Sequence, residues 1–159
     1  MRLFFVIVSV LVLTLAVSGL VVGQTNPIAG TWKRDLAKSK YTGTPAKSQT
    51  RTYEAQADGF WKISVESIGI DEKHVAYSYI VKFDGKDYPV NEGTADGPDT
   101  INLKRVDSNS VSSSFKKAGR VVETTKAVVS EDGKVLTIMS KGTNASGQSF
   151  DNRMVFDKQ

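Results

Sequence analysis

The chain contains no cysteine among its 159 residues and a single histidine, His74. Disulfides, thiolate metal ligands and cysteine nucleophiles are therefore excluded. One histidine without a second cannot build an ordinary transition-metal site, and carboxylates alone favour hard cations instead. The sequence also lacks Gly-x-Ser-x-Gly, a phosphate-binding loop, His-Glu-x-x-His and Gly-x-Gly-x-x-Gly. We expect no metal site, no cofactor and no enzymatic activity.

A strong excess of charge of one sign is also missing. Lys and Arg number 21 against 17 Asp and Glu, which gives a net charge of +4. The basic residues are scattered between apolar segments, and the paired carboxylates Asp71-Glu72 and Glu131-Asp132 fall in turns, where exposure should keep both members ionised. This balance is too mild for phosphate-backbone binding, so we expect no nucleic-acid partner.

Only one long hydrophobic run is present, and it lies at the N-terminus. Met1-Arg2 precedes the apolar run 3–17, and small residues cluster in 18–23. This is the order of a charged region, a hydrophobic region and a cleavage site in a signal peptide. We predict a signal peptide at 1–23 and an exported mature protein, periplasmic or secreted, with no stable membrane anchor. The alternative is a retained apolar run, which at about 20 residues could span a bilayer.

The remainder of the chain shows a period of two, interrupted by Asp-Gly turns at 58–59, 84–85 and 132–133. This pattern predicts short β-strands joined by tight connections. The expected strands begin with the segment that contains Gly30 and continue at 49–55, 60–68, 74–83, 88–91, 100–106, 110–117, 121–129, 135–141 and 150–156. Segment 35–47 has no amphipathic period, and we expect a loop there, at most with a helical turn at 36–39.

Sequential hairpins favour a meander, and closing such a sheet on itself protects its edges. We therefore expect an all-β fold, an up-and-down antiparallel β-barrel of eight to ten strands, in one domain over 24–159. The alternative is an open sandwich, which would need long crossover connections, whereas the connections here are mostly short.

A Gly-x-Trp at Gly30-Thr31-Trp32 opens the first of these strands. Glycine allows the backbone to bend where the indole would close one end of a barrel. Read with the segments 36–41, 82–90 and 155–158, this pattern resembles the calycin group, the lipocalins and fatty-acid-binding proteins, and in particular small exported bacterial lipocalin-like proteins. The resemblance covers about residues 28–158.

The resemblance implies that a basic residue of the last strand stacks on the tryptophan, and Arg153 is the candidate. Fatty-acid-binding proteins instead use an Arg-x-Tyr in the last strand to hold a carboxylate, but Val155 occupies the tyrosine position here. We therefore assign Arg153 to barrel closure, together with Gly30 and Trp32. The two lid helices of that family also cannot fit into segment 35–47.

Candidate ligand contacts come from the apolar and aromatic face of 74–83. If this face points inward, the predicted ligand-binding residues are Trp61, Tyr77, Tyr79, Phe83, Arg105, Phe115 and Lys126. Arg105 is in phase with Ile101 and Leu103, and Lys126 is in phase with Val122 and Val128. A buried cation needs a partner, which an anionic head group could provide. The alternative is that the aromatics are core and the cations lie at strand ends, Arg105 at the rim or in a salt bridge.

Two functional hypotheses follow. The first is an exported, lipocalin-like barrel that binds a small hydrophobic or amphipathic ligand without catalysis. The second is an envelope or secreted protein-interaction module with a filled barrel core, in which a loop such as 92–99 would contact an unknown protein partner. They differ in whether the barrel interior is hollow.

Overall fold

The computed structural model describes residues 26–90 and 97–159. The predicted signal peptide and most of the loop 92–99 lie outside these residues, so neither prediction is tested by the structure. Within the described residues the chain forms ten strands and one 3-10 helix. No helix in these two ranges is long and apolar enough to cross a membrane.

The ten strands follow one another along the chain with short connections. They are β1 (Gly30–Lys40), β2 (Ser48–Ala55), β3 (Trp61–Ile68), β4 (His74–Val81), β5 (Asp84–Pro89), β6 (Thr100–Arg105), β7 (Ser110–Lys117), β8 (Arg120–Val129), β9 (Val135–Thr143) and β10 (Ser149–Lys158). The 3-10 helix η1 (Ala57–Gly59) connects β2 to β3 at the predicted Asp58-Gly59 turn.

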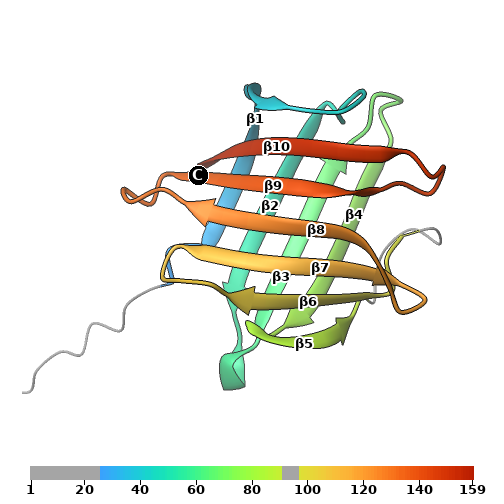
Figure 1. Cartoon of the computed structure of the whole chain (residues 1–159). Helices are drawn as coiled ribbons and strands as arrows, with labels where there is room; N and C mark the ends of the chain where they lie inside the picture. The colour runs from blue at the N-terminus through green and yellow to red at the C-terminus, as the bar shows by residue number, and fades with distance from the viewer. Residues whose placement is uncertain (1–25, 91–96) are drawn as a thin grey trace, which may run out of the picture.

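The strands form one antiparallel sheet in the order β4-β3-β2-β1-β10-β9-β8-β7-β6-β5. Each pair of neighbours is consecutive in the chain except β1 and β10, which join the two halves. Figure 1 shows β1–β4 as a back layer crossed steeply by β5–β10 in front. The sheet thus curls into a nearly closed barrel, and the predicted up-and-down antiparallel β-barrel is confirmed.

The barrel has one seam without a backbone ladder, between β4 and β5. β4 pairs with β3 and β5 with β6, and the two end strands are not hydrogen-bonded neighbours in the sheet. Side chains span this region instead. The Phe60 ring packs edge to face against Tyr88 of β5 with centroids 6.1 Å apart, and Lys82 Nζ lies 4.3 Å from the centroid of the Phe60 ring.

The expected loop at 35–47 is wrong in its first half, because β1 continues to Lys40. The register against β10 shifts between Asp35 and Lys40, so β1 bulges there. Ser39 stabilises the bulge: its hydroxyl donates to the Asp35 carbonyl at 2.6 Å and accepts from the Val155 amide at 2.9 Å. No helix forms between β1 and β2, so this part of the barrel has no lid helices.

Trp32 closes one end of the barrel. Its side chain is fully buried, and its Nε1 donates to the Ile28 carbonyl at 2.8 Å. Gly30 adopts a φ of +116°, and a Cβ at this position would lie 3.2 Å from Lys158 Cε. Glycine is therefore favoured here by the backbone conformation, whereas the flexible Lys158 side chain could shift to make room for a Cβ.

The cation over the Trp32 ring is Lys158 and not Arg153. The β1–β10 register places Lys158 opposite Trp32, with Nζ 5.0 Å from the ring centroid. Arg153 lies opposite Lys40 at the other end of β1, is exposed, and donates to the Lys38 carbonyl at 3.3 Å. The expectation for Arg153 is corrected, because strand pairing and not position in the motif decides which cation reaches the indole.

Replacing Lys158 by Ala should lower the Tm, since an exposed cation over a tryptophan contributes about 0.5–1 kcal/mol. Arg153→Ala is the matched control, because it removes a cation from the same strand without touching Trp32, and should leave the Tm within error. Thermal unfolding followed by near-UV circular dichroism measures both. An equal or larger loss for Arg153→Ala would contradict this assignment.

Candidate functional site

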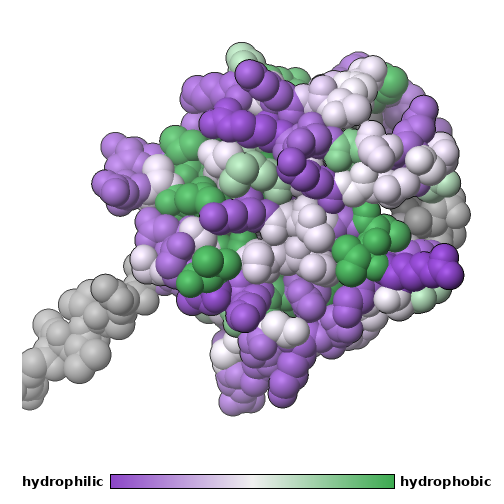
Figure 2. All heavy atoms as spheres, in the orientation of Figure 1, coloured by the Kyte–Doolittle hydropathy of each residue, from purple (hydrophilic) through white to green (hydrophobic). Residues whose placement is uncertain are grey.

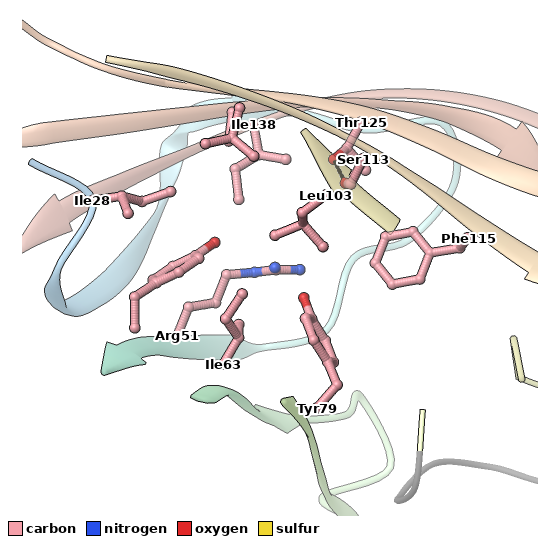
Figure 3. Close-up of a pocket in the computed structure, with 12 residues that line it drawn as sticks. Ile28, Arg51, Ile63, Tyr79, Leu103, Ser113, Phe115, Thr125 and Ile138 are labelled. Atoms are coloured by element: carbon pink, nitrogen blue, oxygen red, sulfur yellow. Dashed lines mark hydrogen bonds between the residues drawn. The ribbon is translucent and has the colours of Figure 1, made fainter. Parts of the chain in front are cut away.

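Arg51 of β2 divides the interior of the barrel into two parts. In Figure 3 its guanidinium lies in the middle of the barrel, with Tyr79, Leu103 and Phe115 around it. A cavity of about 20 Å³ lies on its closed side, enough for roughly one water molecule. Towards Trp32 the interior is packed by buried residues of the main core cluster, including Ile63, Val81, Ile101, Leu136 and Phe156.

The hollow part lies at the opposite end, which we call the mouth chamber. It has a volume of about 170 Å³ and is lined by Arg51, Val75, Tyr77, Val90, Gly97, Pro98, Phe115 and Glu123. Two more open recesses share residues with it. The larger, of about 320 Å³, includes Thr42, Gln49, Arg51, Tyr77, Glu123, Ser140 and Asn152, and the smaller, of about 250 Å³, includes Lys117, Glu123 and Phe150.

The Arg51 side chain carries a charge that no carboxylate neutralises by direct contact within the described residues. Its Nε is buried and has no hydrogen-bond partner among them. The guanidinium carbon lies 5.8 Å from the centroid of the Phe156 ring. Arginine does not lose its proton to escape burial, so this charge is a fixed property of the interior.

Tyrosine hydroxyls surround the guanidinium. Burial alone would lower the pKa of Arg51, but three neighbouring phenol groups outweigh this effect and hold the pKa above its ordinary value. These groups belong to Tyr53, Tyr77 and Tyr79. Burial in turn raises the pKa of Tyr77 and of Tyr79. Both tyrosines therefore remain neutral at physiological pH and can donate or accept hydrogen bonds.

Glu123 of β8 is the second ionisable group in the chamber. It is half-buried, lies opposite Phe115 of β7 and Gly142 of β9, and accepts a hydrogen bond from Ser140 Oγ at 2.5 Å. Burial raises the pKa of Glu123, although the Ser140 hydrogen bond and the charge of Arg51 oppose this. The chamber thus holds a cation and a carboxylate that are not an ion pair within 4.0 Å.

Gly142 makes room for this wall. A Cβ at Gly142 would collide with the Val122 carbonyl oxygen and would lie 2.8 Å from Phe150 Cζ and 2.9 Å from Glu123 Cα. The Phe150 ring can therefore pack over β9 beside Glu123 only because residue 142 has no side chain. Phe150 lines both open recesses.

The structure separates the predicted ligand-binding residues into two groups. Tyr77 and Phe115 line the mouth chamber, and Tyr79 and Phe115 line the small cavity beside Arg51. Trp61, Phe83 and Arg105 instead form a cluster at strand ends on the closed side. The Trp61 and Phe83 rings are 5.4 Å apart, and the Arg105 guanidinium lies 4.9 Å from the Phe83 centroid.

Arg105 therefore lies at the rim of the barrel, which was the alternative to a ligand contact in the interior. Its Nη1 donates to the Ser108 carbonyl at 3.3 Å, and it does not line the mouth chamber. This group has a hydrogen bond and an aromatic partner within the chain, so it needs no ligand to compensate its charge.

The placement of Lys126 inside the barrel is wrong. Lys126 is exposed on the outer face, whereas Thr125, Ala127 and Val129 point inward. The β7–β8 register shifts next to Glu123, and the apolar run 127–129 allows either phase. Alternation alone could not decide which of the two faces of β8 is the inner one.

Sequence reasoning missed Arg51, Gln49 and Glu123. A strand with polar residues on both faces looks solvent-exposed when it is read by alternation, as in Gln49-Thr50-Arg51-Thr52-Tyr53. One available signal was the alternation of long side chains with threonines, since Thr50 and Thr52 share the other face of the strand.

No group of three or more His, Asp or Glu side chains in the described part of the chain could hold a metal ion.

Comparisons with known proteins show the fold and do not extend to a family. No protein-family model matches the chain, and no curated protein matches it. Among solved structures, the fluorescent protein UnaG superposes with a TM-score of 0.53 at 11% identity, over 82% of this chain and 96% of that chain. The zebrafish ileal bile acid-binding protein, complexed with cholic acid, gives a TM-score of 0.48 at 13% identity, over 84% and 99%.

The siderocalin Ex-FABP, described as having dual ligand specificities, gives a TM-score of 0.43 at 9% identity, over 84% of this chain and 74% of that chain. At these identities the likeness carries the architecture alone. That architecture is an antiparallel up-and-down β-barrel.

The raised pKa of Glu123 predicts a pH-dependent stability. At acid pH below its ordinary pKa the carboxyl is protonated in both the folded and unfolded states and costs nothing. As the pH rises through the interval between the ordinary and the raised pKa, the unfolded state ionises more readily, and the folded state loses relative stability. Glu123→Gln should therefore raise the Tm at pH 7.5 and have a much smaller effect at pH 4.

Scanning calorimetry at the two pH values measures this difference. The matched control is Glu131→Gln, which makes the same chemical change at an exposed turn residue. A Tm gain for Glu123→Gln that is the same at pH 4 and pH 7.5 would show that the carboxylate is not penalised by burial.

Proposed function

We propose that this protein is an exported, non-catalytic barrel that binds a small hydrophobic or amphipathic ligand in the mouth chamber. The single observation that supports it most is a cavity that combines apolar walls with a cation that no carboxylate of the described residues contacts. Val75, Val90, Pro98 and Phe115 supply apolar surface, and Arg51 supplies the charge. A concave, mostly apolar pocket with a few convergent polar groups is the usual form of a small-molecule site.

Arg51 favours a ligand whose head group is an anion or a strong acceptor. A buried charge is costly without a partner, and a bound anion would supply that partner only in the complex. The Tyr77 hydroxyl can add a second hydrogen bond to the same head group. The inner chamber is small, so the rest of the ligand would extend into the open recess beside Glu123 and Phe150.

Export rests on the pattern of residues 1–23 and completes the proposal. A charged start, an apolar run and a cluster of small residues ending at Gly23 support cleavage after Gly23. The absence of catalysis rests on chemistry: in the described residues neither His74 nor any other group pairs a nucleophile with a general base in the chamber. Tyr77, the tyrosine that lines the chamber, is half-buried, and its raised pKa keeps it neutral.

Binding is tested with the full chain expressed with residues 1–23 in place and the processed protein purified. Native mass spectrometry and titration with a fluorescent fatty-acid probe should show saturable one-to-one binding. Arg51→Met should weaken it about tenfold or more, as expected for loss of a hydrogen bond to a charged group. Lys126→Met is the control, because it removes the same charge from the outer face.

Circular dichroism must show that both variants are folded. Saturable binding that is unaffected by Arg51→Met would place the ligand elsewhere. Absence of any saturable binding would overturn the carrier function and favour the protein-interaction module, for which the packed closed half of the barrel already provides a filled core.

A further inference from the structure

The polar groups of the mouth chamber are not of one kind. Arg51 offers donors only, while Glu123 offers acceptors and has one oxygen bonded to Ser140. Gln49 adds a third group, since its Nε2 donates to Ser67 Oγ at 3.2 Å and its buried Oε1 has no partner among the described residues. All three side chains line the same open recess, together with Tyr77.

These groups do not satisfy one another. Arg51 and Glu123 are not within 4.0 Å as an ion pair, although the charge of Arg51 is felt at Glu123. Arg51 Nε and Gln49 Oε1 are enclosed atoms without a hydrogen-bond partner among the described residues, and one Glu123 oxygen is bonded to Ser140. Buried polar atoms are normally paired. An unpaired donor or acceptor therefore indicates which kind of atom a bound ligand would have to supply.

A simple carboxylate would satisfy only half of this arrangement. Its charge would match Arg51, but it would bring a second anion into the recess that already contains Glu123, and like charges at short range are unfavourable. A head group with an O–H or N–H next to its acid group would match both sides. The acid would bind Arg51 and Tyr77, and the neighbouring donor would bind Glu123 or Gln49.

We infer that the ligand is an amphiphilic acid that carries a hydrogen-bond donor adjacent to its acid group, as in a 2-hydroxy acid or an amino-acid-type head group. This inference rests on the proposed function, because it names the ligand class of the same chamber. The site would discriminate between acids with and without this donor. An acid that lacks the donor would leave the acceptor groups of the site without a hydrogen bond, and it would therefore bind more weakly. Glu123 is thus a specificity-determining residue, whereas Arg51 supplies affinity for both kinds of acid.

The test compares three probes with the same ten-carbon tail: decanoate, 2-hydroxydecanoate and 1-decanol. Each displaces the fluorescent probe from the purified processed protein at pH 8. We expect 2-hydroxydecanoate to bind about tenfold more tightly than decanoate, the ratio for one added hydrogen bond to a charged group. Decanol, which lacks the anion, should bind most weakly.

Variants separate the two roles. Glu123→Gln should bring the ratio between the two acids close to one, because the amide can donate to a plain carboxylate and no longer repels it. Glu131→Gln, at an exposed turn, should leave the ratio as it is. Arg51→Met should weaken both acids without changing the order of the two. If Glu123→Gln is poorly folded by circular dichroism, Ser140→Ala, which removes the hydroxyl that holds Glu123, should reduce the ratio instead.

The outcomes are distinguishable. Equal affinities of the two acids, or a ratio that survives Glu123→Gln, would overturn the inference and leave a binding barrel for simple acids. Failure of all three probes to bind would overturn the proposed function, and the inferred ligand class with it.

Discussion

The structure depends on the positive charge of Arg51, which lies in the interior of the barrel, where charged groups are normally avoided. Arg51 extends from β2 into the middle of a barrel whose other central side chains are mostly apolar or aromatic, apart from Ser113 and Thr125. On one side of it the interior is packed, with Trp32 closing the end, and on the other side it is hollow and open. The guanidinium therefore marks the boundary between the part of the barrel that stabilises the fold and the part that is free to bind.

This division also separates cation–aromatic contacts of the closed end from the chamber. Lys158 over Trp32 and Arg105 over Phe83 have partners within the chain and contribute to packing. Arg51 has the Phe156 ring and tyrosine hydroxyls as neighbours but no carboxylate within 4.0 Å, and Glu123 has the Ser140 hydroxyl but no cation within that distance. Charged side chains without an oppositely charged partner are expected inside a protein where a bound ligand can supply that partner.

The described residues on the face shown in Figure 2 form no large hydrophobic patch. Figure 2 shows a largely hydrophilic face in which hydrophobic residues occur in small separate groups. The large exposed hydrophobic residues, such as Ile70, Ile80 and Val121, lie on different strands and connections of the sheet. Single exposed hydrophobic residues are ordinary on soluble domains and do not mark an interface.

The sequence predicted the architecture well, because its signals are local. Asp-Gly turns and the period of two predict a strand meander, and the glycine before Trp32 predicts the closed end. The site was predicted less well, since it depends on tertiary pairing. Trp32 meets Lys158 because of the β1–β10 register, Lys126 faces outward because β8 is irregular near Glu123, and Arg51 lies on a strand that looks solvated. None of these facts is contained in a short window of residues.

The missing ladder between β4 and β5 has a mechanical consequence. Elsewhere around the barrel, widening the interior would stretch rows of backbone hydrogen bonds. Among the described residues, this seam is instead held by the chain connection at 82–83 and by side-chain contacts such as Phe60 with Tyr88. The ring of backbone hydrogen bonds around the barrel is thus interrupted between β4 and β5. Tyr77 and Val75 lie on one side of the split and Val90 on the other, so the chamber is bounded by the two margins that can move apart with the least loss of bonding. The size of the chamber therefore depends on side-chain packing at this seam, which can adjust to a ligand. The number of strands, in contrast, is fixed.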